Sequence, residues 1–126
     1  MALVVVGLGG ALGAIARYMA TDWARALAGD AFPWGTLAVN VSGSFALGFL
    51  MVWLQSMAPS SQIRQLVGIG FLGSFTTFST FSYEAVEMAR GGNALGAGGY
   101  AAGSVLLGLV AVVAGAVLAT TLVRAG

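Results

Sequence analysis

The chain alternates four long apolar stretches with short polar breaks. The stretches cover about residues 2–21, 34–56, 64–88 and 96–123, and each approaches or exceeds the ~20 residues that a helix needs to cross a bilayer. The breaks, at 22–33, 58–62 and 90–93, are rich in charged residues, glycine, proline and serine. Lipid offers no hydrogen-bond partner to an open backbone, so helices are the expected form. The pattern therefore predicts an all-α membrane protein with four transmembrane helices.

The composition agrees with this prediction. Of 126 residues, 7% are charged and 59% are hydrophobic, whereas soluble domains average about 25% charged residues. We expect one transmembrane domain over residues 1–126. Cysteine and histidine are absent, which excludes disulfides, thiol nucleophiles, histidine bases and the usual zinc sites. A net charge of +1 without any basic run gives no indication of nucleic-acid binding.

Small residues recur four positions apart within the apolar stretches. The pairs are Gly9/Gly13, Ser44/Gly48, Gly99/Gly103 and Ala111/Gly115. Such spacing lets helices approach closely in lipid, where no hydrophobic force drives them together. One pair alone is ordinary for a membrane helix, but together the pairs predict a tightly packed bundle. Because four thin helices enclose little space, we also expect a second subunit.

The few arginines do not favour one orientation in the membrane. With four crossings, both termini and the 58–62 break share one side, which carries Arg64 and Arg124. The other side carries Arg25 and Arg90, so the positive-inside rule selects neither side. This balance favours insertion both ways and an antiparallel two-fold dimer. The alternative is that so few arginines carry no information on orientation.

The string 70–84, GFLGSFTTFSTFSYE, is polar where its surroundings are apolar. It holds six Ser/Thr hydroxyls and four phenylalanines. Three of these rings fall on neighbouring faces if the segment is one helix: Phe75, Phe78 and Phe81. Gly70 and Gly73 mark a point where that helix can be interrupted. Ordinary packing, with each hydroxyl bonded to its own helix, is one interpretation; the density of donors favours a functional lining.

Other polar residues lie inside the remaining apolar stretches. Asn40 shares a helix face with Thr36 and Ser44. Intramembrane polar groups usually face a bundle interior or a wet cavity, so Asn40 either bonds to another helix or lines a pathway. Tyr100 and Ser104, four positions apart, leave the same choice open.

Arg17 stands inside the first apolar stretch, where a charge costs at least about 2.5 kcal/mol. Its side chain either extends to the membrane surface, or binds backbone carbonyls, or attracts an anion into a vestibule. The chemistry of the polar residues in the apolar stretches also favours an anion. Hydroxyls, an amide and the positive edges of phenyl rings suit a small anion, whereas a cation path favours carboxylates or carbonyl rings.

Three segments resemble the signature segments of the Fluc, or CrcB, family of fluoride channels. They are GGALGAIARY (9–18), GTLAVNVSGSFALG (35–48) and GFLGSFTTFSTFSYE (70–84). The likeness extends over essentially the whole chain, and TTFSTF is its most specific part. It implies a passive, fluoride-selective channel that exports fluoride across the bacterial cytoplasmic (inner) membrane and relieves fluoride toxicity. It also implies a multi-pass, dual-topology antiparallel homodimer with two pores along the subunit interface.

The resemblance also assigns roles to residues. The pore residues of the family correspond here to Asn40, Phe78, Phe81, Ser79, Thr80, Tyr100 and Ser104. The third span would be broken near its centre, where carbonyls of Gly73 and Ser74 from both subunits would hold one structural sodium ion. Arg17 matches the arginine of the first-span motif, and Glu84 the acid that closes the third. The family has a smaller or aliphatic residue where this chain has Phe75, so packing beside the break is expected to differ.

Two other functions stay open from the sequence. A small multidrug-resistance-type transporter also has four spans and dual topology, but it relies on a carboxylate within the first span; here the first acid is Asp22, at the end of that span. A non-transporting assembly protein would use the 70–84 string only for helix packing and would carry no ion flux. An enzyme is not expected, because no nucleophile–base pair can form without histidine or cysteine.

Overall fold

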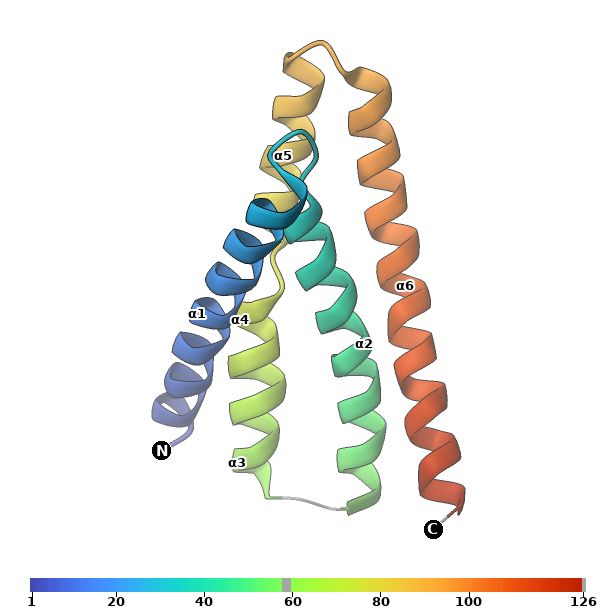
Figure 1. Ribbon diagram of the computed structural model, residues 1–126. Coiled ribbons are helices and arrows are strands. Elements are labelled where there is room, and N and C mark those ends of the chain that lie inside the picture. Colours follow the sequence, from blue (N-terminus) through green and yellow to red (C-terminus); the bar gives the residue numbers. More distant parts are fainter. Residues whose placement is uncertain (58–59, 126) are drawn as a thin grey trace.

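The computed structural model describes residues 1–57 and 60–125, and almost all of them are helical (Figure 1). The elements in chain order are α1 (Ala2–Ala28), α2 (Trp34–Met57), α3 (Ser61–Ile63), η1 (Arg64–Leu72), α4 (Gly73–Phe75), α5 (Phe78–Arg90) and α6 (Ala94–Ala125). Within these two ranges no strand is formed. The predicted all-α class is therefore confirmed.

The long helices correspond to predicted membrane spans. In the described part of the chain, α1, α2 and α6 are long and apolar enough to cross a membrane. The third predicted span, 64–88, is divided between η1 with α4 and the separate helix α5. The N-terminus, the start of α3 and the end of α6 lie at one end of the molecule (Figure 1). Of the predicted 58–62 break, residues 58 and 59 lie outside the described residues.

Helix α1 is longer than predicted. The prediction ended the first span at residue 21, but the helix continues to Ala28 and stops at Gly29, whose φ of 76° is left-handed. Residues 22–28 are polar enough to leave the membrane, yet alanine, leucine and arginine are strong helix formers. The change in polarity after residue 21 therefore indicates where the apolar segment ends, and the helix itself continues beyond it.

The interior is built from close backbone contacts at glycines, and apolar side chains point outward. Helix α1 packs against η1. A Cβ at Gly9 would overlap the carbonyl oxygen of Leu66, and one at Gly13 would overlap that of Phe71. Away from these contacts on α1, Leu3 is 88% exposed. This inside-out distribution is the arrangement expected when the surrounding solvent is lipid.

Helix α2 packs along α6 by the same device. A Cβ at Gly48 would overlap the carbonyl oxygen of Val112, and one at Gly115 would overlap that of Phe45. The close packing predicted at small residues is thus confirmed at the glycines of three of the four pairs, Gly9, Gly13, Gly48 and Gly115. The fourth pair, Gly99/Gly103 in α6, has no atom within 4 Å of an added Cβ among the described residues, so it makes no such contact within the chain.

The backbone leaves helical geometry between α4 and α5. Thr76 has φ −83° and ψ 155°, and Thr77 has φ −148° and ψ 118°. Phe75 therefore ends α4, while Phe78 and Phe81 belong to α5. The prediction that the three rings lie on neighbouring faces of one helix is wrong, because two extended residues separate the first ring from the others.

The glycines before these two residues are themselves helical. Gly70 lies in η1 and Gly73 begins α4 with φ −62°. Gly70 serves close packing, since an added Cβ would lie 2.7 Å from the carbonyl oxygen of Val6 in α1. η1 is a π-helix of nine residues, a rare form often found at functional sites. Hydropathy does not distinguish it from an α-helix, and it was not predicted.

Candidate functional site

The side chain of Asn40 in α2 binds the backbone of the extended residue Thr77. The Thr77 N–H donates to Asn40 Oδ1 at 2.7 Å, and Asn40 Nδ2 donates to the Thr77 carbonyl at 2.9 Å. An amide side chain has a carbonyl oxygen that accepts and an NH₂ group that donates, so it can bind the N–H and the C=O of one extended residue together. Both sequence interpretations of Asn40 therefore remain relevant: it bonds to another segment, and it lies beside a groove.

Thr77 also begins α5 as its N-cap. Its Oγ1 accepts from the Thr80 N–H at 3.2 Å, and its hydroxyl donates to Thr80 Oγ1 at 3.0 Å. Ser79 Oγ lies 3.4 Å from Thr77 Oγ1. The residues predicted as a polar track, Ser79 and Thr80, thus lie in the exposed first turn of α5. The cap itself was missed, although a threonine directly before a helix is a recognised start signal.

A groove of about 390 Å³ runs past this junction, between α2, the η1–α4 segment, α5 and α6. It brings together five of the predicted site residues: Asn40, Gly73, Phe78, Phe81 and Ser104. The rings of Phe78 and Phe81 are 5.6 Å apart, and Phe78 is 77% exposed. No charged side chain lines the groove among the described residues.

Ser104 contributes a free hydroxyl to this groove. Its Oγ is buried and has no hydrogen-bond partner within residues 1–57 and 60–125. Buried hydroxyls without a partner are uncommon because they lose the hydrogen bonds they made in water. A small polar species in the groove would restore that interaction.

The junction places opposite helix ends next to each other. α5 begins at Phe78, so the first N–H groups of this helix have no intrahelical acceptor and carry partial positive charge. α4 ends at Phe75, so the last carbonyls of that segment carry partial negative charge. The same groove therefore offers the N–H of Phe78, which suits an anion, and the backbone oxygen of Gly73, which suits a cation.

Glu84 joins three helices further along α5. Its Oε1 accepts from the Thr36 hydroxyl of α2 at 2.8 Å, and its Oε2 accepts from the Tyr100 hydroxyl of α6 at 2.8 Å. Thr36 and Tyr100 are 3% and 2% exposed. The ring of Tyr100 also lies 5.3 Å from that of Phe81. Tyr100, predicted as a pore residue, thus donates its hydroxyl to Glu84 and does not itself line the groove. It contacts the lining through the ring of Phe81.

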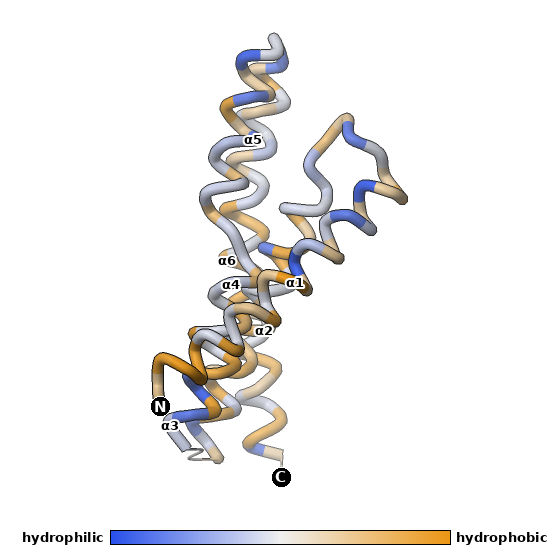
Figure 2. Tube along the Cα trace, turned by 90° about the vertical axis from the view of Figure 1, so that its left-hand side faces the viewer, coloured by the Kyte–Doolittle hydropathy of each residue, from blue (hydrophilic) through white to orange (hydrophobic). Residues whose placement is uncertain are grey.

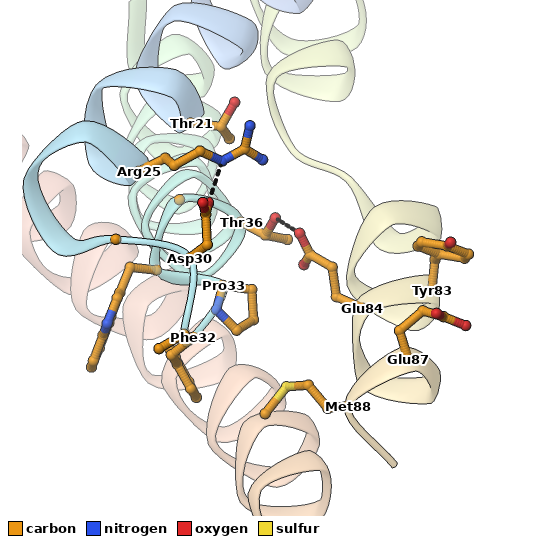
Figure 3. Close-up of a pocket in the computed structure, with 14 residues that line it drawn as sticks. Thr21, Arg25, Asp30, Phe32, Pro33, Thr36, Tyr83, Glu84, Glu87 and Met88 are labelled. Atoms are coloured by element: carbon orange, nitrogen blue, oxygen red, sulfur yellow. Dashed lines mark hydrogen bonds and ion pairs between the residues drawn. The ribbon is translucent and has the colours of Figure 1, made fainter. Parts of the chain in front are cut away.

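A second cavity, of about 220 Å³, lies beyond Glu84 (Figure 3). Arg25 and Asp30 form an ion pair at 2.8 Å on its rim, and Glu87 of α5 faces it as well. The hydrophilic residues of α5 and of the α1–α2 connection stand out in Figure 2 at this end of the molecule. This cavity differs from the neutral groove in being lined by both acids and arginine.

Six of the predicted site residues do not line the groove: Ser79, Thr80, Glu84 and Tyr100, already described, and Arg17 and Ser74. Arg17 is half-buried in α1, and its side chain makes no hydrogen bond or ion pair within the described residues. Ser74 follows Gly73 but faces α1, since its Oγ lies 3.2 Å from the Cβ position of Gly10. Neither the groove nor the second cavity is lined by Arg17.

Removing the Glu84 carboxylate is expected to destabilise the fold. In Glu84→Ala, the buried hydroxyls of Thr36 and Tyr100 lose their acceptor, at about 1–3 kcal/mol for each group left unsatisfied. Glu84→Gln keeps one oxygen and should lose less than half as much. Glu87→Ala is the matched control, because its carboxylate makes only an exposed ion pair with Arg90, worth about 0–1 kcal/mol. Thermal unfolding in detergent measures the order; equal losses for Glu84→Ala and Glu87→Ala would contradict it.

These features define the class of protein: a helical membrane protein with an apolar exterior and a neutral polar groove at a helix junction. Comparison with known sequences gives the family. The family described as "CrcB-like protein, Camphor Resistance (CrcB)" matches residues 4–116. A match over this share of the chain shows that the protein belongs to the CrcB family, as the three signature segments predicted.

Relatives of known name agree with this assignment. A protein of Rhizobium johnstonii is 47% identical over 113 residues, 89% of this chain and 90% of its own length. One of Hahella chejuensis is 48% identical over 117 residues, 92% of each chain. One of Dehalococcoides mccartyi is 43% identical over 121 residues, 95% of this chain and 93% of its own. All three are named "Fluoride-specific ion channel FluC". The family is one of multi-pass membrane channels, in agreement with the expectation that the protein is not an enzyme.

Proposed function

We propose that this chain is a fluoride-selective, passive ion channel. The observation that carries the proposal is the neutral groove at the α4–α5 junction, which combines donors and ring edges and has no carboxylate among the described residues that line it. Its donors are the Asn40 amide, the N–H of Phe78 at the start of α5, and the Ser104 hydroxyl, which has no partner among the described residues. Fluoride is small and tightly hydrated, so it enters only where fixed donors replace lost water. The names of the relatives support fluoride as the ion.

Within this proposal the groove residues take distinct parts. One N–H of Asn40 binds Thr77, and the other has no acceptor among the described residues, which leaves it for the anion. The rings of Phe78 and Phe81 present positive edges. Ser79 and Thr80, both exposed in the single chain, complete the polar lining when a second copy closes the groove. Tyr100 contributes indirectly, because its ring packs against that of Phe81. Glu84 stabilises the bundle beside the path, and Arg17 supplies positive potential at a vestibule.

The pore is completed, we further propose, by a second copy in antiparallel orientation, giving two pores in a dual-topology homodimer. Three features of the single chain support a missing partner. The groove is open, Phe78 is 77% exposed, and the Gly99/Gly103 pair has no neighbour within the described chain. The charges also fit, because the end with Arg64 and Arg124 carries no acid, whereas all four acids lie towards the other end.

A structural sodium ion at the break fits the residues present. In a continuous helix the Thr77 N–H would bond to the Gly73 carbonyl, but here it bonds to Asn40 Oδ1. The Gly73 oxygen is thereby released, and the Ser74 oxygen lies in the same last turn of α4. Hard cations favour such neutral oxygen ligands. When bound, the ion would neutralise carbonyls that are costly to leave bare in lipid; Gly73 is exposed in the single chain, so a second copy would complete the site.

In the cell, the proposed channel lies in the cytoplasmic (inner) membrane with the α4–α5 junction near mid-membrane. It lets fluoride leave down its gradient and so relieves fluoride toxicity. No step needs an energy source or a covalent intermediate.

The proposed function predicts rapid fluoride efflux from liposomes that contain the purified protein. An ion-selective electrode would follow efflux, with chloride-loaded liposomes as the specificity control and protein-free liposomes as the leak control. We expect fluoride efflux well above leak, and chloride efflux at leak. Absence of fluoride efflux from a folded dimer would overturn the proposal. It would favour the non-transporting assembly protein, or a drug transporter if a proton gradient instead drove uptake of a cationic dye.

A further inference from the structure

We propose that Asn40 is a positioning residue that keeps the chain interrupted at Thr77, in addition to any contact it makes with an anion. The two hydrogen bonds between Asn40 and the Thr77 backbone, at 2.7 Å and 2.9 Å, are the observation that carries this inference. They join residues 37 positions apart in the chain. The Asn40 side chain therefore binds the Thr77 N–H, which would otherwise continue the hydrogen bonding of the helix.

The competing bond is well defined. Thr77 N–H has two possible acceptors: the Gly73 carbonyl, four residues back, and Asn40 Oδ1. The first choice would continue α4 into α5 as one helix. The second choice holds Thr77 at φ −148° and ψ 118°. Because the amide of Asn40 also donates to the Thr77 carbonyl, it holds the N–H and the C=O of this one residue and fixes its extended conformation.

Neighbouring residues of α2 allow this role and do not share it. Gly43 brings α2 close to the break, since an added Cβ would overlap Cγ2 of Thr76. Thr36 is bonded to Glu84, and Ser42 donates to the carbonyl of Ala38 in its own helix. Within the described residues, Asn40 is the α2 side chain bonded to the backbone of the break.

Two properties of the groove depend on this contact. The direction of α5, and with it the position of the Phe78 ring, follows from the extended Thr77. The Gly73 carbonyl stays free only while Thr77 N–H is held elsewhere. The importance of a free Gly73 carbonyl rests on the proposed sodium site. The extended conformation of Thr77 is independent of that proposal.

Threonine labelling tests the conformation directly. With 13C,15N-threonine, a spectrum that requires two consecutive labelled residues reports only Thr77 and Thr121, because 76–77 and 120–121 are the two Thr–Thr pairs of the sequence. In Asn40→Leu and Asn40→Ala we expect the Thr77 Cα shift to move from an extended to a helical value, with Thr121 unchanged. Ser42→Ala, on the same helix, is the control and should leave both signals in place. A Thr77 Cα shift that stays extended in both Asn40 variants would overturn the proposal.

Wild-type protein provides a second test that needs no folded variant. Asn40 and Asn93 are the two asparagines of the chain. One side-chain N–H of Asn40 should exchange with solvent much more slowly than those of exposed Asn93, because it is bonded to the Thr77 carbonyl. Equal exchange for both residues would overturn the inference.

Thermal unfolding in sodium and in N-methylglucamine tests whether sodium binding depends on Asn40. Sodium should raise the melting temperature of the wild type and Ser42→Ala, and this rise should be lost in Asn40→Leu. A sodium effect that persists in an Asn40 variant with helical Thr77 would overturn the link. The Thr77 readout requires no fluoride, so a protein with an Asn40-dependent break but no fluoride efflux would contradict the proposed function alone.

Discussion

Phe78→Ile is expected to reduce fluoride efflux by at least about tenfold, and we expect the variant to remain folded. The Phe78 ring is 77% exposed and lines the neutral groove beside Phe81. Isoleucine keeps an apolar side chain but lacks the positive ring edge that would stabilise an anion. Losing about 1.4 kcal/mol of such stabilisation lowers a rate tenfold. Electrode recordings of efflux from liposomes would measure the loss.

The matched control is Phe49→Ile. Phe49 in α2 packs against Trp53, with ring centroids 6.1 Å apart, and does not line the groove. Efflux should therefore stay within about twofold of wild type if the fold is retained, because this substitution leaves the groove lining unchanged. Equal losses in the two variants would mean that the ring at position 78 has no special role in conduction.

Gly48→Ala is expected to destabilise the bundle by about 3 kcal/mol or more, the upper range for overpacking. An added methyl would overlap the carbonyl oxygen of Val112 in α6, which is backbone and cannot turn away. The α2–α6 pair would have to separate, and the opposite contact of Gly115 with Phe45 would be lost at the same time. Thermal unfolding and the yield of folded protein would measure the effect.

Gly7→Ala is the control for this prediction. Gly7 lies in α1, and an added Cβ would meet no atom within 4 Å. Alanine is favoured over glycine in a helix by about 0.8–1.0 kcal/mol, so the variant should be as stable as the wild type or more stable. A Gly48→Ala protein that unfolds at the same temperature as Gly7→Ala would show that α2 and α6 are not in such close contact.

Much of the architecture was predictable because the solvent is lipid. The rule that spanning segments are helical, and about 20 residues long, converts a hydropathy pattern into elements. The segments 34–56 and 96–123 correspond closely to α2 and α6. The small-residue spacing likewise predicted close contacts at Gly9, Gly48 and Gly115, because only such residues let backbones touch.

The candidate site was predictable in composition and less so in geometry. The sequence singled out the 70–84 string and Asn40, and both line the groove. It placed the interruption beside Gly70 and Gly73, whereas the extended residues are Thr76 and Thr77. Local propensity favours glycine as a helix breaker, but the actual position depends on where α2 supplies an alternative partner for the backbone.

The sequence by itself determined the class, the spans at 34–56 and 96–123, most of the small-residue contacts and the family, since each follows from local composition or from a contiguous motif. The tertiary structure alone decided which polar groups meet. Asn40 bonds to Thr77 across 37 positions, and Thr36 bonds to Glu84 across 48. A hydrogen bond of this kind depends on how two helices are placed in space, and no local pattern records that placement. In this protein, that placement sets where the chain stops being a helix and therefore where the groove lies.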